Sequence, residues 1–262
     1  MKKYLLLLVC MGIFIPCKIY AVDITVGATT WYAWPDDSEI DPAFFLGPVL
    51  SVKLNDDFNL TFVYLYGKFN MKADDSVTTS KITRQDADFA LNYRLADYFK
   101  LFGGIKYLKH SFTYTEEDPG WRFLLDFDVS KYDTTRTTDS FGPGLGLSVT
   151  YPILDNLFLL GTLSGLYLWE NYEEKYRKET VVTPAAPPLV PAVTNIDEGK
   201  KDKIFNSYGC NLTLAIAYHI PSVSTMISLG GRYHRFIKTD DLSNDTTFYG
   251  VTLTATYSFS LN

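Results

Sequence analysis

The chain has 262 residues, of which 47% are hydrophobic and 16% aromatic, and its formal net charge is −6. This acidity argues against a nucleic-acid partner, which needs a basic surface. Two of the three cysteines fall within the first 21 residues, so Cys210 has no cysteine partner in the rest of the chain, and no Cys/His cluster points to zinc. We therefore expect no metal site and no cofactor.

The first 21 residues have the features of a cleavable signal peptide. Two lysines precede an apolar run that ends at Pro16, and the small residue Ala21 offers a cleavage point. The run is too short for a good membrane-spanning helix, and the proline directly before Cys17 argues against a lipoprotein signal. We predict a signal peptide, 1–21, followed by a single domain, 22–262. Cleavage leaves 21 basic residues against 30 acidic ones, a net charge of −9.

Ten segments of the remaining chain alternate apolar and polar residues. In the last of them, 249–261, the odd positions are Tyr, Val, Leu, Ala, Tyr, Phe and Leu, and the even positions are Gly, Thr and Ser. A period of two is typical of a strand with one apolar face. The predicted strands cover residues 23–34, 43–54, 58–70, 82–95, 99–115, 138–153, 157–172, 204–219, 225–238 and 247–261.

Short and long connections alternate between these strands. The short ones are rich in Asn, Asp, Ser and Pro, the residues that favour turns; they are 55–57, 96–98, 154–156 and 221–224. The long ones are 35–42, 71–81, 116–137, 173–203 and 239–246. An even number of strands with short turns at one end and long loops at the other is typical of a bacterial barrel that crosses a membrane. In such a barrel the short turns are expected to face the periplasm and the long loops the outside of the cell.

Strand length separates this fold from a soluble β-sandwich, the main alternative. Segments of 12 to 17 residues exceed the usual five or six and fit a tilted crossing of a bilayer. Lipid cannot satisfy an open sheet edge, so such strands must close. The sequence therefore predicts an all-β fold, a single antiparallel up-and-down transmembrane β-barrel of about ten strands.

Aromatic residues gather at the strand ends, where two interfacial girdles are expected. The group beside the short turns comprises Phe58, Tyr93, Phe99, Tyr151, Tyr218 and Tyr257. The group toward the long loops comprises Trp34, Tyr66, Phe141, Trp169 and Tyr249. Alternation also assigns faces: odd positions of the fourth and sixth strands and even positions of the eighth face lipid. The seventh strand, 157–172, is apolar on both faces, and its orientation stays open.

These features together resemble those of bacterial outer-membrane β-barrel proteins. The resemblance covers the whole chain after the signal peptide and implies a location in the cell outer membrane, with outer-membrane lipid and the outer-membrane assembly machinery as partners. One departure concerns the end of the chain. Such proteins typically finish on an aromatic residue, whereas this one finishes on Leu261 and Asn262.

Charged residues on the inward faces predict a network in the barrel lumen. Its members lie on the fourth, fifth and ninth strands: Arg84, Asp86, Asp88, Arg94, Lys106, His110, Arg232 and His234. If 96–98 is the turn, opposed residues of the fourth and fifth strands have numbers that sum to 194. This register pairs Asp88 with Lys106, Arg84 with His110 and Arg94 with Lys100. We interpret the network as a salt-bridged filling of the lumen.

Two enzymatic alternatives start from the same residues. Ten strands and the pair Asp86 and Asp88 resemble the omptin family of surface proteases, but Arg232 stands where an acid would orient His234. A lipid-modifying enzyme would need a serine near a histidine, and the adjacent His110 and Ser111 point to opposite faces of a strand. We therefore assign no catalytic residue.

The function expected first is a structural role, or passage of small solutes through a narrow pore. The alternative is a surface adhesin or interaction protein that binds a surface ligand through the loops 116–137 and 173–203. An omptin-like or lipid-modifying enzyme is a third and weaker alternative. The sequence names no solute, ligand or oligomeric state.

Overall fold

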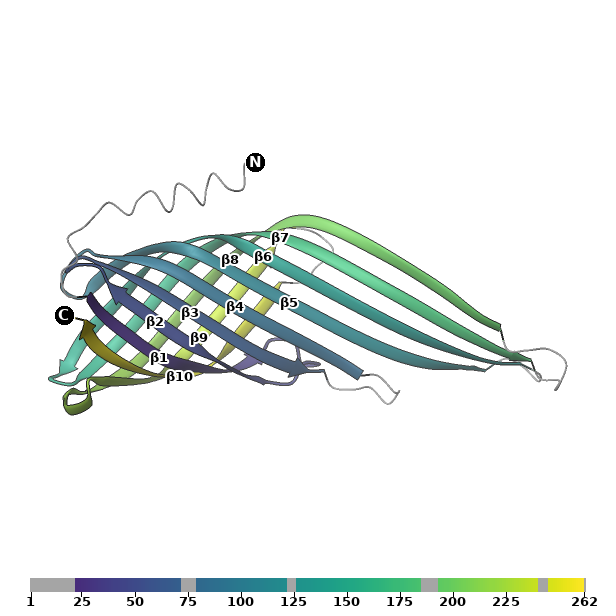
Figure 1. Ribbon diagram of the computed structural model, residues 1–262, viewed down its shortest axis with the longest axis horizontal. Helices are drawn as coiled ribbons and strands as arrows, with labels where there is room; N and C mark the ends of the chain where they lie inside the picture. Colours follow the sequence, from purple (N-terminus) through teal and green to yellow (C-terminus); the bar gives the residue numbers. More distant parts are fainter. Residues whose placement is uncertain (1–21, 72–78, 122–125, 185–192, 240–244, 262) are drawn as a thin grey trace.

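The protein is described by a computed structural model that covers residues 22–71, 79–121, 126–184, 193–239 and 245–261. The predicted signal peptide lies outside these residues. Ten strands form one closed barrel in which each strand pairs antiparallel with its sequence neighbours and β1 closes on β10 (Figure 1). Their bounds are β1 Val22–Pro35, β2 Ala43–Lys53, β3 Phe58–Asn70, β4 Thr79–Arg94, β5 Phe99–Trp121, β6 Asp126–Leu154, β7 Leu157–Pro184, β8 Val193–Ile220, β9 Thr225–Lys238 and β10 Thr246–Leu261. The closed barrel confirms the predicted fold and excludes the sandwich.

The four predicted short turns are all present. Side-chain hydrogen bonds stabilise one of them, and the backbone preferences of its residues favour another. The Asn55 side-chain oxygen accepts hydrogen bonds from the backbone N–H groups of Asp57 and Phe58, at 2.9 and 2.8 Å. The β8–β9 connection is one 3-10 turn, Pro221–Val223, followed by Ser224 in the left-handed region at φ 47°. Proline fits the start of this turn because its φ angle is already close to the required value.

The outward faces carry the apolar residues that alternation predicted. Phe89 and Leu91 of β4, Leu145 and Leu147 of β6, and Leu214 of β8 are exposed on the barrel exterior. The orientation of β7 is also defined, because Leu163 is 57% exposed and Leu168 is 0% exposed. Odd positions of β7 therefore face lipid and even positions face the lumen. The sequence could not decide this, since both faces of β7 are apolar.

Both aromatic girdles are present. At the short-turn end, Phe58 lies opposite Tyr93, with ring centroids 4.9 Å apart. At the other end, Phe141 lies opposite Trp169, and Trp34 stacks on Tyr249 with centroids 6.1 Å apart. Aromatic rings at two levels are what the two interfaces of a bilayer favour. No helix in the described parts of the chain is long and apolar enough to cross a membrane.

The predicted loops 116–137 and 173–203 are the main correction. Their described residues are strand, and β5 to β8 continue together past the outer girdle as one four-stranded sheet (Figure 1). We call this sheet the extension; it comprises 116–121, 126–137, 173–184 and 193–203. The proline-rich stretch 185–192 lies outside the described residues. The prediction failed because these segments carry charges on both faces, so the apolar alternation stops where the lipid stops although backbone pairing continues.

Candidate functional site: the charged layer in the lumen

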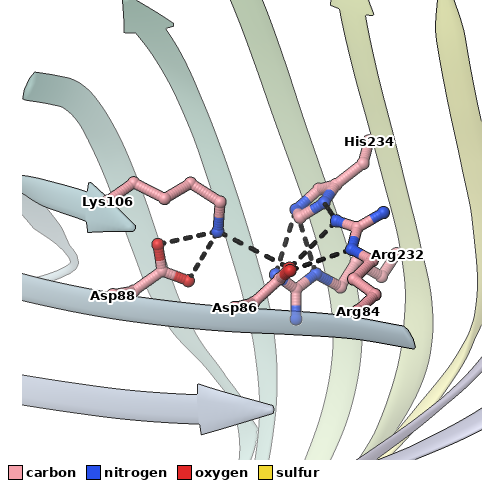
Figure 2. Close-up of polar contacts among 6 residues, drawn as sticks. All are labelled: Arg84, Asp86, Asp88, Lys106, Arg232 and His234. Carbon is pink, nitrogen blue, oxygen red and sulfur yellow. Dashed lines mark hydrogen bonds and ion pairs between the residues drawn. The ribbon is translucent and has the colours of Figure 1, made fainter. Parts of the chain in front are cut away.

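Six charged or titratable side chains meet inside the barrel, and we call them the charged layer: Arg84, Asp86, Asp88, Lys106, Arg232 and His234 (Figure 2). The predicted register of β4 and β5 is confirmed, with Asp88 opposite Lys106 and Arg84 opposite His110. Lys106 Nζ donates to both carboxylate oxygens of Asp88, at 2.9 and 3.0 Å. The three-residue turn before Phe99 fixes this register, and the register places the ion pair.

Arg84 and Asp86 form the most deeply buried ion pair of the layer. Arg84 Nε donates to Asp86 Oδ1 at 2.8 Å and Nη2 donates to Oδ2 at 2.9 Å. Arg84 is 0% exposed and Asp86 is 1% exposed. Lys106 Nζ lies 3.7 Å from Asp86 Oδ2, so the carboxylate has a second positive neighbour. Buried charges persist only when paired in this way.

His234 lies between two guanidinium groups. Arg84 Nη2 is 3.2 Å from Nδ1 of this histidine, and Arg232 Nη2 is 3.0 Å from Nε2. Guanidinium groups only donate, while a neutral imidazole accepts at one nitrogen only. His234 is 0% exposed and no carboxylate contacts its ring within the described network. The acid–histidine arrangement of an omptin-like protease is therefore not supported.

Two of the predicted residues are not among the six side chains of the charged layer: Arg94 lies near the turn between β4 and β5, and His110 borders the layer opposite Arg84. Arg94 faces Lys100 as the register requires, but its Nη2 donates to Asp97 Oδ1 at 3.0 Å in the periplasmic turn. This exposed acid relieves the repulsion between Arg94 and Lys100. His110 faces Arg84 across the strands and lies edge-on to Phe248, with ring centroids 6.3 Å apart.

The sequence prediction missed an aromatic layer that packs on the extracellular side of the charges. The Arg84 guanidinium carbon lies 4.3 Å from the ring centroid of Phe248 and 5.3 Å from that of Trp31. Phe45 and Phe69 join the same buried cluster. Strand parity turns Trp31 and Phe45 inward, whereas the girdle prediction considers only the aromatic residues at the strand ends. Arginine over aromatic faces is a favourable contact in a desolvated site.

Buried side chains from every strand fill the lumen at the level of these two layers. Each strand contributes at least one inward side chain that is at most 5% exposed; one from each is Trp31, Phe45, Leu65, Arg84, Lys106, Ser140, Leu168, Ser207, His234 and Phe248. Among the described residues, this ring leaves almost no inward surface that water can reach at its level. A barrel of ten strands encloses little more than its own side chains, and in this protein those side chains fill the cross-section of the lumen at this level.

The extension carries a second set of ion pairs outside the membrane. Arg136 Nε donates to Glu174 Oε2 at 2.9 Å, and Lys201 Nζ lies 3.6 Å from the other oxygen of that carboxylate. On the opposite face, Glu173 pairs with Lys175 at 2.6 Å and with Lys200 at 2.9 Å. The Glu173–Lys175 pair lies within β7, whereas the other three pairs bridge neighbouring strands and tie the sheet together where no lipid or barrel closure supports it.

The Glu173 pairs predict a loosening of the extension in acid. Hydrogen bonds from Lys175 and then Lys200 lower the pKa of Glu173 from its ordinary 4.5 to about 2. A lowered carboxyl pKa contributes stability above the unfolded-state value, and this is lost as pH falls from about 4.5 through about 2. Hydrogen-exchange protection of β7 and β8 amides in the extension should fall over this window, less steeply in high salt. Glu173→Gln should remove this part of the pH dependence, and protection unchanged from pH 5 to pH 2 would contradict the assignment.

Comparisons with known proteins locate no relative by sequence: no protein-family model and no curated protein matches. Solved structures that align include the outer membrane protease OmpT from Escherichia coli, at 9% identity and a TM-score of 0.49, covering 91% of this chain and 97% of that one. A major outer membrane protein from Thermus thermophilus aligns at 13% identity and 0.40, covering 92% and 100%. The translocator domain of autotransporter NalP from Neisseria meningitidis aligns at 11% and 0.41, covering 98% and 95%. None of these likenesses bears on activity.

No group of three or more His, Cys, Asp and Glu side chains in the described part of the chain is placed to hold a metal ion.

The structural class of the protein follows from its own geometry. Ten antiparallel strands close on themselves, their exterior is apolar, and aromatic girdles flank that exterior at both ends. The protein is a closed, ten-stranded antiparallel β-barrel with the apolar exterior of a transmembrane barrel.

Proposed function

We propose that this protein is a surface interaction protein, in which the barrel is the membrane anchor and the extension binds an extracellular partner. The observation that carries this proposal is the length of four consecutive strands. β5 to β8 have 23, 29, 28 and 28 residues, whereas the other six have 11 to 16. The described part of β7 in the extension alone spans about 40 Å at roughly 3.3 Å per residue.

The surface of the extension suits recognition of a partner. On the face continuous with the lumen, Lys178 Nζ lies 4.9 Å from the Tyr132 ring centroid, and Lys201 Nζ lies 5.9 Å from that of Tyr176. Tyr176 also packs over Gly199, where a Cβ atom would lie 2.3 Å from the ring. Aromatic rings beside charged groups supply both contact area and directional bonds, as in many binding surfaces.

The sealed lumen argues against the narrow pore as the main role. A pore needs a continuous wetted path, and buried inward side chains from all ten strands, including those of the charged and aromatic layers, interrupt it. Opening a path would require several buried side chains to move together, not one gate residue. Transport therefore ranks below surface binding, although the barrel anchors both alternatives equally well.

A trimmed variant tests the proposal. Glu116 lies opposite Tyr132, and Glu174 lies opposite Lys201, so an Asn-Gly turn can replace 117–131 and another can replace 175–200. We expect the trimmed barrel to insert and to keep heat-modifiable migration on a gel. Bacteria that carry the full chain should adhere to at least one member of a panel of purified glycans and matrix proteins, and bacteria that carry the trimmed barrel should not. Equal adhesion with both chains would refute the proposal.

Planar-bilayer recording tests the competing role. We expect the purified full-length barrel to show no steady conductance step in salt solution, because the lumen is filled at the level of Arg84 and Phe248. Asp88→Ala should stay non-conducting, since it removes the ion pair and leaves the aromatic layer in place. A stable open level in the unmodified protein would restore the pore as the leading function.

A further inference from the structure

A cavity of about 330 Å³ lies in the lumen between the charged layer and the periplasmic turns. Its lining comes from the periplasmic halves of β3 to β8, including Val63, Asn92, Phe102, Ser148 and Asn211. Asp88 and Lys106 of the charged layer line one part of it. Its volume is within the range of small-molecule sites, which starts near 300 Å³.

Two glycines of the lining cannot carry a side chain without displacing the wall. A Cβ atom at Gly144 would lie 2.6 Å from the Leu166 side chain, and one at Gly104 would lie 2.1 Å from the backbone oxygen of Phe89. Ala90 also lines the space, with Val63 and Leu166 as apolar neighbours. The walls therefore suit an apolar body.

The polar end of the cavity presents acceptors. Asp88 and Lys106 both line it, but the Asp88 side chain is 35% exposed and that of Lys106 only 3%. A molecule in the cavity meets the carboxylate, while the ammonium group is covered. A ligand head that donates hydrogen bonds would satisfy the exposed carboxylate oxygens of Asp88.

The charged side chains around the cavity favour a ligand whose polar head is uncharged. The charged layer holds three cations, Arg84, Lys106 and Arg232, and two carboxylates, so an ammonium head would add to an excess of positive charge. A carboxylate head would approach the exposed Asp88 oxygens and be repelled. Hydroxyl groups of Ser148 and Ser164 line the walls and can accommodate a neutral polar group.

We propose that this cavity binds a small neutral amphiphile, with a hydroxyl or amide donor at Asp88 and a short apolar chain along the wall toward the periplasm. This site is separate from the extension and does not depend on surface binding.

Three probes of the same length distinguish the head groups: 1-hexanol, hexylammonium and hexanoate. Each is titrated into the full-length barrel in lipid nanodiscs while backbone amide NMR shifts are followed. We expect saturable shifts at cavity residues such as Gly104, Gly144 and Ser164 with 1-hexanol, and affinities at least tenfold weaker with the two charged probes. Tighter binding of hexylammonium or hexanoate would overturn the neutral-head assignment.

Matched variants separate the cavity from the lipid. Ser148→Phe should fill the cavity and abolish the saturable shifts, whereas Leu147→Phe puts the same ring on the lipid face and should leave them. If Ser148→Phe fails to fold, Thr162→Phe with the control Leu163→Phe repeats the comparison on β7. Shifts that do not saturate, or that survive both filling variants, show partition into the bilayer alone and overturn the proposal.

Discussion

Arg84→Met is expected to lower the free energy of unfolding of the barrel by about 3–5 kcal/mol, the usual effect of removing one partner of a buried ion pair. The change leaves Asp86, which is 1% exposed, with only Lys106 at 3.7 Å as a positive neighbour. It also removes the guanidinium from the face of Phe248. Methionine fills a similar volume, so the loss reflects the uncompensated carboxylate more than a void.

Urea titration of the barrel in lipid vesicles, followed by heat-modifiable migration, measures this loss. Two control variants show which interaction is responsible for the loss of stability. The double variant Arg84→Met with Asp86→Leu removes both charges and should recover most of the stability. Arg94→Met breaks an exposed pair with Asp97 and should cost less than about 1 kcal/mol. If Arg84→Met is no more costly than Arg94→Met, the buried pair does not stabilise the barrel.

Leu253→Arg should destabilise the barrel by roughly 2–4 kcal/mol, the cost of a cationic side chain facing lipid at mid-membrane. Leu253 is 47% exposed on the exterior and lies midway between Tyr249 and Tyr257, which mark the two girdles on β10. Its neighbours on the flanking strands are Thr30 and Leu229. An arginine there reaches neither interface without distorting the bilayer or its own side chain.

Thr254→Arg is the matched control, with the same side chain one residue along the strand. Thr254 faces the lumen, where its hydroxyl forms a hydrogen bond with that of Thr29 at 2.7 Å. An arginine at this position loses that bond but stays out of the lipid, so its cost should be the smaller of the two in the same urea titration. Equal losses at both positions would show that the assigned faces are wrong.

The sequence alone determined the features that depend on neighbouring residues. Alternation gave the ten strands and most of their faces, because a strand turns successive side chains to opposite sides. Turn residues gave the four tight connections. The contact between Asp88 and Lys106 also followed from the sequence, since a three-residue turn fixes the register of β4 and β5 over their full length.

Only the tertiary structure decided what meets across the lumen. Arg84, His234 and Trp31 come from β4, β9 and β1, and their contacts depend on barrel closure and on the register accumulated around all ten strands. No local sequence pattern specifies this accumulated register. The sequence did not predict the extension because lipid imposes alternating apolar and polar residues only on the part of a strand that it contacts. Beyond the outer girdle, strands such as β7 and β8 pair through their backbones without this constraint on their side chains.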